Sequence, residues 1–268
     1  LPGSGKTVAL FYLVRDLAPG SASALGLLHA ATIRALGNGV VFQASNVAFG
    51  AELWFSDGTS NGTYLVKDIR PGTEGSGIFD MYRWGDRVYF RADDGVHGAE
   101  LWRTDGTEAG TVLVKDIAPG PRSANLGAPL AVVDGRLYFS ANDGLHGEEL
   151  WVSDGTAAGT KMVADLIPGS GASQPLRLTG LGDRLFFSAL HPRYGRELWF
   201  GVIPAAWVDT DDDQLPDWWE QQYGLDAGSS NAPAGNADGD DYTDWEEFVA
   251  DTQPDSTNSV FPDVVVTN

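Results

Sequence analysis

Apolar residues in the first three quarters of the chain fall in short runs separated by turn residues. The runs 135–142, 148–154 and 160–166 are rich in Val, Leu, Tyr, Phe and Trp, and Gly, Asp, Asn and Pro lie between them. This alternation is typical of β-strands joined by tight turns. Leu137, Tyr138 and Phe139 are consecutive, so both faces of that strand are apolar, which indicates a sheet covered on both sides. The pattern predicts an all-β body.

The pattern repeats, and repeats decide how the rest of the chain is interpreted. Glu-Leu-Trp begins at residues 52, 100, 149 and 197, with spacings of 48, 49 and 48. Three of these copies lead into Asp-Gly-Thr-x-x-Gly-Thr, a segment in which Asp can accept backbone amides and Gly supplies a positive φ. A third block follows, ending two residues before Pro-Gly. Its copies are Val14-Arg15-Asp16-Leu17, Val66-Lys67-Asp68-Ile69, Val114-Lys115-Asp116-Ile117 and Val163-Ala164-Asp165-Leu166.

Each repeat is expected to hold four strands, which in the third repeat are 135–142, 148–154, 160–166 and 175–181. Four strands in about 48 residues predict a β-propeller blade. The chain begins with copies of the third and fourth strands and ends the array with copies of the first and second. Those halves sum to one blade, which would close a ring of four. The alternative, that the array is open or part of a larger ring, stays open.

The long motif Glu-Leu-Trp-x-x-Asp-Gly-Thr-x-x-Gly-Thr-x-Leu-Val-Lys-Asp-Ile-x-Pro-Gly resembles the ELWxxDGT repeat of large bacterial surface and secreted proteins. The resemblance covers about residues 8–201. The fourth copy departs from it, because Glu197-Leu198-Trp199 runs into Gly201-Val202-Ile203-Pro204 with no Asp-Gly-Thr turn. The resemblance implies an extracellular, repeat-built architecture without catalytic activity.

Several repeated side chains could be functional, but their repetition favours structural roles. An enzyme needs one catalytic acid rather than four copies, so Glu52 and its equivalents are expected to form cross-strand ion pairs with Lys67 and Lys115. The repeated Trp residues are expected to pack between blades rather than bind sugars. His97 and His146 occupy positions held by Phe49 and Tyr194 in the other repeats, which suggests packing of a flat ring. Asp93-Asp94-Gly95 and Asn142-Asp143-Gly144 are hairpin turns, with weak cation binding as a minor alternative.

Charge divides the chain sharply. The 268 residues include 17 Lys and Arg against 37 Asp and Glu, a net charge of −20. Residues 205–268 contain 16 of the acidic residues and no Lys or Arg, so residues 1–204 are nearly neutral. This step predicts a domain boundary near Pro204. The acidic balance argues against nucleic acid and anionic membranes as partners. The absence of Cys excludes thiol catalysis and Cys-ligated zinc.

The acidic segment contains two copies of the twelve-residue spacing that binds calcium. Oxygen ligands at positions 1, 3, 5, 7, 9 and 12 converge on one point, with position 7 contributing its backbone carbonyl. Ca²⁺ prefers six to eight such oxygens. The sixth position of such a loop is usually Gly, but here it is Gln214 in the first loop and Asp241 in the second. We expect this to weaken the affinity for calcium. The ligand sets are Asp209, Asp211, Asp213, Leu215, Asp217 and Glu220, and Asn236, Asp238, Asp240, Tyr242, Asp244 and Glu247.

A short apolar helix is expected after each loop, so the segment reads as a small helical, EF-hand-like module. It resembles the paired calcium loops of dockerin-like and thrombospondin type-3-like bacterial modules. A solvated acidic linker is the alternative. The expected organisation is a β-propeller-like repeat domain at 1–204, a calcium-loop module at 205–256, and the start of a further domain or a linker at 257–268.

Together these features predict a fragment of a secreted or surface-displayed bacterial protein that belongs to a larger multidomain chain. Its expected role is non-catalytic binding, adhesion or scaffolding, with a protein or glycan ligand and about two Ca²⁺ ions. No stretch is long and apolar enough for membrane insertion. A secreted propeller enzyme acting on carbohydrate, and a dockerin-type module that docks to a protein, are the alternatives.

Overall fold

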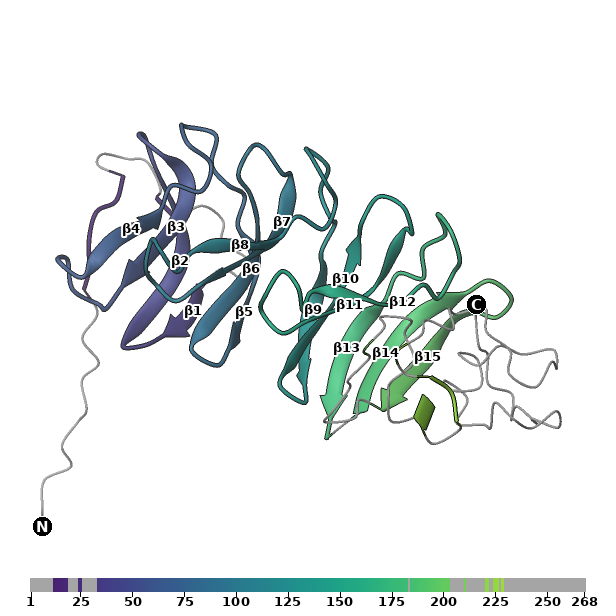
Figure 1. Ribbon diagram of the computed structural model, residues 1–268. Helices are drawn as coiled ribbons and strands as arrows, with labels where there is room; N and C mark the ends of the chain where they lie inside the picture. The colour runs from purple at the N-terminus through teal and green to yellow at the C-terminus, as the bar shows by residue number, and fades with distance from the viewer. Residues whose placement is uncertain are drawn as a thin grey trace, which may run out of the picture. The chain divides into compact units, whose positions relative to one another are not determined.

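A computed structural model of the chain describes residues 12–18, 24–25, 33–182, 184–202, 210, 220–221, 224–226 and 228. From residue 33 to residue 202 the described chain is all-β, with four small antiparallel sheets that follow one another along the sequence (Figure 1). No helix among these residues is long and apolar enough to cross a membrane.

The first three sheets have four strands each, and the fourth has three. In every sheet the strands stand in sequence order. The first sheet holds β1 (Ile33–Leu36), β2 (Gly39–Asn46), β3 (Gly50–Ser56) and β4 (Thr63–Lys67). The second holds β5 (Phe79–Trp84), β6 (Arg87–Asp93), β7 (Ala99–Thr104) and β8 (Val112–Lys115). The third holds β9 (Gly127–Val133), β10 (Arg136–Asn142), β11 (Glu148–Ser153) and β12 (Lys161–Ala164). The fourth holds β13 (Leu176–Leu181), β14 (Arg184–His191) and β15 (Gly195–Val202).

The chain divides into two compact units, residues 1–90 with 104–111, and residues 91–103 with 112–268. The turn at 104–111 belongs to the first unit, where the Tyr64 hydroxyl donates a hydrogen bond to the Gly106 carbonyl at 3.3 Å. The first unit has an apolar cluster of Phe42, Ala44 and Trp54. The second has a larger cluster that includes Tyr138, Leu150 and Phe187.

The strand positions expected from the sequence are close to those observed, but their grouping is different. The expected fourth strand of the third repeat, 175–181, is β13, the first strand of the next sheet. The corresponding place in the third sheet is taken by β9, which pairs with β10. After β12 the chain leaves the third sheet. β13 then begins the fourth sheet, where it lies beside β9 of the third sheet. A sheet is therefore built from the last strand of one repeat and the first three of the next.

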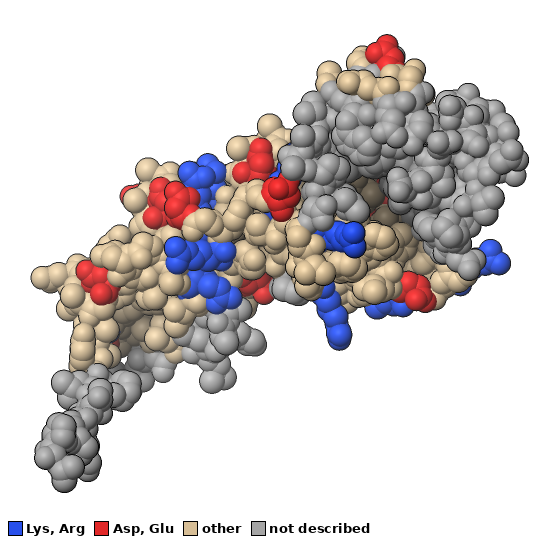
Figure 2. Space-filling view, turned by 90° about the horizontal axis from the view of Figure 1, so that it is seen from below, with Lys and Arg blue, Asp and Glu red and all other residues tan. Residues whose placement is uncertain are grey.

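The surface of the described residues reflects the balanced charge of residues 1–204. On the face seen in Figure 2, Lys and Arg side chains are interspersed with Asp and Glu. The expected boundary near Pro204 and the segment 257–268 lie outside the described residues, and β15, which ends at Val202, is the last strand within them.

Candidate functional site

The Glu of the first three Glu-Leu-Trp motifs is buried and accepts hydrogen bonds from the segment that leaves the same sheet, whereas Glu197 in the fourth motif is exposed. Glu52 accepts the Ile69 amide at 3.0 Å and the Ser76 hydroxyl at 2.7 Å. Glu100 accepts the Ile117 and Ala118 amides at 3.0 and 3.2 Å. The carboxylates therefore join the middle of a sheet to the crossover segment that follows it, which is a structural role.

Burial raises the pKa of these carboxyls even though the hydrogen bonds favour the charged form. Desolvation by burial is the largest cause, and it raises the pKa from 4.5 to about 7 in Glu52, Glu100 and Glu149. A perturbed pKa often marks a catalytic site. Here the same raised pKa occurs at three equivalent glutamates, so the repeat architecture accounts for it.

The expected Glu–Lys ion pair is wrong. Lys67 is opposite Leu53 in the register of β3 and β4, and Glu52 is the neighbour of Leu53. Successive residues of a strand point to opposite faces, so the carboxylate and the ammonium group lie on different sides of the sheet. The Lys67 ammonium instead donates to the carbonyl of Thr111 at 2.9 Å, and that of Lys115 donates to the carbonyl of Thr160 at 2.6 Å.

The Asp-Gly-Thr segment is a hydrogen-bonded turn, as predicted. Asp57 accepts the amide and the hydroxyl of Thr59 at 2.8 and 2.7 Å, and the Thr59 hydroxyl accepts the Gly62 amide at 2.9 Å. Gly58 has a φ of 90°, the left-handed conformation that glycine adopts without strain. The same bonds recur in the turns at 105–111 and 154–160. The motif thus organises the backbone.

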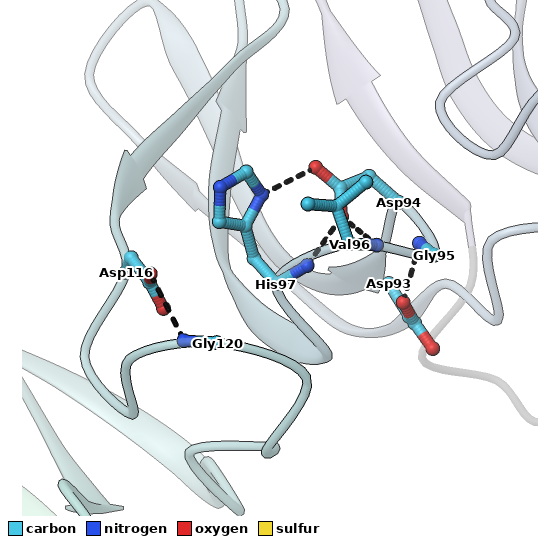
Figure 3. Close-up of polar contacts among 7 residues, drawn as sticks. All are labelled: Asp93, Asp94, Gly95, Val96, His97, Asp116 and Gly120. Carbon is cyan, nitrogen blue, oxygen red and sulfur yellow. Dashed lines mark hydrogen bonds and ion pairs between the residues drawn. The ribbon is translucent and has the colours of Figure 1, made fainter.

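The loop between the first two strands of each Glu-Leu-Trp repeat is a different turn and carries the histidines (Figure 3). Asp94 Oδ1 accepts the amides of Val96 and His97 at 2.9 and 2.8 Å, and its Oδ2 lies 2.7 Å from His97 Nδ1. Asp143 and His146 reproduce this geometry in the third repeat, with the same 2.7 Å between carboxylate and ring. Packing of a flat ring was expected at this position. Both side chains are partly exposed, and each ring is also paired with a carboxylate, which was not expected.

The pair shifts both pKa values. The hydrogen bond with Asp94 raises the pKa of His97 above 6.5, and nearby Asp116 and Glu100 add to the effect. Burial alone would raise the pKa of Asp94, but the bonds from the His97 amide and ring and from the Val96 amide outweigh it and lower the pKa. Figure 3 shows Asp116 on the neighbouring segment, where it accepts the Gly120 amide at 3.4 Å.

All four repeats build this loop, although the residues differ. In the first repeat Asn46 accepts the amides of Ala48 and Phe49, both at 2.9 Å. In the fourth, His191 Nδ1 accepts the amides of Arg193 and Tyr194, both at 3.2 Å. Sequence analysis assigned His191 no role. Its alignment with Asn46, Asp94 and Asp143 was the available signal.

The tip of the loop is apolar and exposed in the second and third repeats. Val96 and Leu145 precede the two histidines, and both are largely exposed. Each loop therefore presents an aliphatic side chain beside a partly exposed imidazole, with a carboxylate beneath the ring. The carboxylates that suggested weak cation binding here are used within the turn, since Asp93 accepts the Gly95 amide at 2.7 Å. No group of three or more His, Asp or Glu residues suited to a metal ion occurs in the described part of the chain.

The repeated tryptophans are in the core, which agrees with the expected packing role. Trp54, Trp102 and Trp151 are each buried. Trp199, in the fourth repeat, is partly buried, and its indole donates to the Ala189 carbonyl at 3.2 Å.

Of the expected calcium ligands, Glu220 alone lies among the described residues. It is buried and helical, and its backbone carbonyl accepts the Leu225 amide at 2.8 Å. The remaining ligands, and the second helix of the expected module, lie outside the described residues. These are Asp209, Asp211, Asp213, Leu215, Asp217, Asn236, Asp238, Asp240, Tyr242, Asp244 and Glu247.

No protein-family profile and no curated protein matches this sequence. Solved structures give distant similarities. A puromycin hydrolase mutant is 19% identical at a TM-score of 0.42, over 62% of this chain and 26% of that one. An α-L-arabinofuranosidase from Podospora anserina is 15% identical at a TM-score of 0.28, over 69% of this chain and 70% of that one. The chain thus spans about a quarter of the hydrolase's length.

Proposed function

We propose that this chain is part of an extracellular bacterial protein, in which a β-propeller-like repeat domain binds a glycan or protein without catalysis. The observation that carries the proposal is the loop built alike in four repeats, with Asn46, Asp94, Asp143 or His191 as acceptor. A catalytic centre requires unlike groups brought to one point. Equivalent loops instead give several similar contacts, as in a repeat-built binding surface.

The loops of the second and third repeats have the composition of a binding surface. An exposed aliphatic residue, Val96 or Leu145, is next to an imidazole held in one orientation by its carboxylate. Fixing the ring before binding reduces the entropy lost when a ligand docks. Two weak, similar contacts on one chain would act together on a polymer, because the second contact forms at high effective concentration. A polysaccharide or a repetitive surface protein is a ligand of that kind.

We further propose that residues 205–256 form a calcium-binding spacer of about two ions. The support is the oxygen-ligand spacing in both loops, in which Glu220 has the twelfth position of the first loop, together with the burial of Glu220.

The binding proposal is tested on an array of immobilised bacterial and plant polysaccharides. We expect the full chain to bind at least one, and the pair His97→Ala and His146→Ala to weaken that binding about tenfold or more. The matched control is the pair Thr107→Ala and Thr156→Ala, which alters the Asp-Gly-Thr turns. Unchanged binding in the histidine variant, or hydrolysis of a polysaccharide by the protein, would contradict the proposal.

A further inference from the structure

The loops of the second, third and fourth repeats lie along one edge of the second unit, because crossover segments join each loop to the next. In the crossover after β8, the Ala124 amide donates to the Ala99 carbonyl at 3.1 Å, and the Ala124 carbonyl accepts the Asn142 amide at 2.7 Å. The crossover after β12 is bonded in the same way, with Gln174 donating to Glu148 and Leu190 donating to Ser173. We call residues 93–98, 121–124, 142–147, 170–174 and 191–195 the loop edge.

Arg122 lies between the two histidine loops. Its carbonyl oxygen is 2.2 Å from the place that a Cβ on Gly98 would occupy, and Gly98 follows His97. Its guanidinium Nη1 is 3.1 Å from the place of a Cβ on Gly144, two residues before His146. The two glycines therefore allow this arginine to approach both loops closely.

The Arg122 guanidinium has no structural partner in the described part of the chain. It is exposed, and it makes no hydrogen bond or ion pair with another described residue. The equivalent residues of the first and third repeats are Glu74 and Gly171, so the repeat does not require a cation at this position. A guanidinium that is not used within the protein is available to a ligand, and its planar fork matches a carboxylate or a sulfate group.

The fourth loop adds a second exposed cation beside an aromatic ring. Arg193 stands at the position that Val96 and Leu145 hold in the other loops. Its guanidinium lies over the ring of Tyr194, 5.5 Å from the centroid, and Tyr194 is 50% exposed. A flat ring next to a guanidinium suits a sugar that carries an acidic group, since the ring packs on the sugar and the guanidinium binds the acid.

In the second and third loops the carboxylates are less exposed than the imidazoles that they bind. The side chains of Asp94 and Asp143 are each 16% exposed, against 37% for His97 and 39% for His146. The hydrogen bond between ring Nδ1 and carboxylate raises the pKa of both histidines. It therefore favours the doubly protonated ring, which presents Nε2–H as a further donor, and Figure 3 shows this ring for His97.

The remaining acids beside these two loops are engaged within the protein. They accept hydrogen bonds from backbone amides or a serine hydroxyl, and they are Asp93, Asp116, Glu148 and Asp165. All of them are only partly exposed, whereas Arg122 and Arg193 are exposed. The exposed charges of the loop edge are therefore positive, although the whole chain has a net charge of −20.

We propose that the loop edge binds an acidic polysaccharide, with Arg122 and Arg193 holding its carboxylate or sulfate groups and Tyr194 packing on a sugar ring. This inference rests on the proposed glycan-binding function and specifies its ligand class. A polymer is the fitting occupant because the loops follow one another along one edge, so that several weak ionic contacts act on one molecule. Contacts of this kind between exposed charges weaken as salt is added.

Paired polymers test the requirement for charge. Polygalacturonate is compared with its methyl ester, and dextran sulfate with dextran, so each pair shares a backbone and differs in charge. Biolayer interferometry measures binding of the full chain in Ca²⁺-free buffer, where metal ions cannot bridge acidic groups. We expect the charged member of at least one pair to bind about tenfold or more tightly at low salt. Most of this preference should disappear at about 1 M NaCl, where the Debye length is about 3 Å. The pair that responds identifies the anion as carboxylate or sulfate.

Arg122→Gln removes one exposed charge without removing a contact to another described side chain. We expect it to lower the affinity for the charged polymer about fivefold or more and to leave the neutral polymer unaffected, since the guanidinium binds the acidic group. Arg193→Gln should act in the same direction. The matched control is Arg184→Gln, which removes the same charge from an exposed residue at the opposite end of β14 from the fourth loop.

Equal affinity for the charged and neutral members of both pairs would overturn the acidic ligand class. Equal effects of Arg122→Gln and Arg184→Gln would overturn the assignment of the contact to the loop edge. In either case the proposed glycan binding stands if a neutral polysaccharide binds and the histidine variants weaken it. Absence of binding to every polysaccharide would contradict both proposals.

Discussion

At the scale of single residues, the buried glutamates show how one side chain can serve a repeat. Each presents two acceptor oxygens to backbone amides, and Glu52 and Glu149 also accept a hydrogen bond from a serine hydroxyl. An unprotonated carboxylate satisfies these donors, but its burial has a desolvation cost, and the raised pKa expresses that cost. Stability and pH are therefore linked through these residues.

Replacing Glu100→Gln should destabilise the protein by about 2–3 kcal/mol, because the amide group of Gln directs its own donors at buried N–H groups and leaves one of them unsatisfied. The Ile117 and Ala118 amides are the groups affected. Urea unfolding followed by Trp fluorescence measures the change. Glu108→Gln, at an exposed position of the same repeat, is the control and should have almost no effect.

The free energy of unfolding should fall as the pH rises from 5 to 8. A carboxyl with a folded pKa of about 7 and an unfolded pKa near 4.5 contributes stability that is present below 4.5 and lost as the pH rises through 7. The raised pKa of His97 and His146 acts in the same direction. Urea midpoints at several pH values measure the slope, which Glu100→Gln should reduce. A midpoint that increases over this range would contradict the assignment.

At the scale of elements, the basic residue of the third block connects one repeat to the turn of the next. Arg15, Lys67 and Lys115 each donate to the carbonyl of the last Thr in the following Asp-Gly-Thr turn. The third repeat has Ala164 at this position, and the fourth repeat has no such turn. The third repeat therefore has no need of a basic residue at 164, because the next repeat has no turn carbonyl to accept its hydrogen bond.

Removing this connection with Lys115→Met should lower the free energy of unfolding by about 1 kcal/mol, since the apolar stem is kept while the bond to Thr160 is lost. Thermal unfolding at fixed pH and salt measures the change. The converse variant, Ala164→Lys, should bring no gain because its acceptor turn is absent. If Ala164→Lys stabilised the protein by as much as Lys115→Met destabilises it, the contact with the turn would be irrelevant.

At the scale of the whole molecule, charge is concentrated where calcium is proposed. Residues 205–268 contain 16 acidic residues and no Lys or Arg, so carboxylates brought into one loop repel each other strongly. Two Ca²⁺ ions would offset four of these charges and allow the loops to close.

Calcium titration of the full chain should therefore give binding heat with a Kd of roughly 10⁻⁴–10⁻³ M, the range of weak extracellular sites. Asp211→Ala and Asp238→Ala should each remove one site, and Asp226→Ala, outside both ligand sets, should remove none. Mg²⁺ is the matched ion control. If no heat appears up to about 10 mM Ca²⁺, ten times the upper Kd, the segment is an acidic linker.

The sequence by itself determined the features that depend on neighbouring residues. The period, the strand positions and the Asp-Gly-Thr turns were predictable, because turn formation and strand propensity act over a few residues. The calcium ligands were predicted from spacing alone, and they stay a prediction because most lie outside the described residues.

The tertiary structure decided the features that join distant segments. A run such as 175–181 has the same pattern whichever sheet it enters, and the choice depends on contacts formed only after folding. The partner of Lys67 lies 44 residues away, so the face to which each side chain points mattered more than their spacing. The pairing of each histidine with a carboxylate was missed because Phe49 at the equivalent position suggested packing alone. In the folded protein the ring at this position is held by the carboxylate three residues before it. The ring is partly exposed in the second and third repeats.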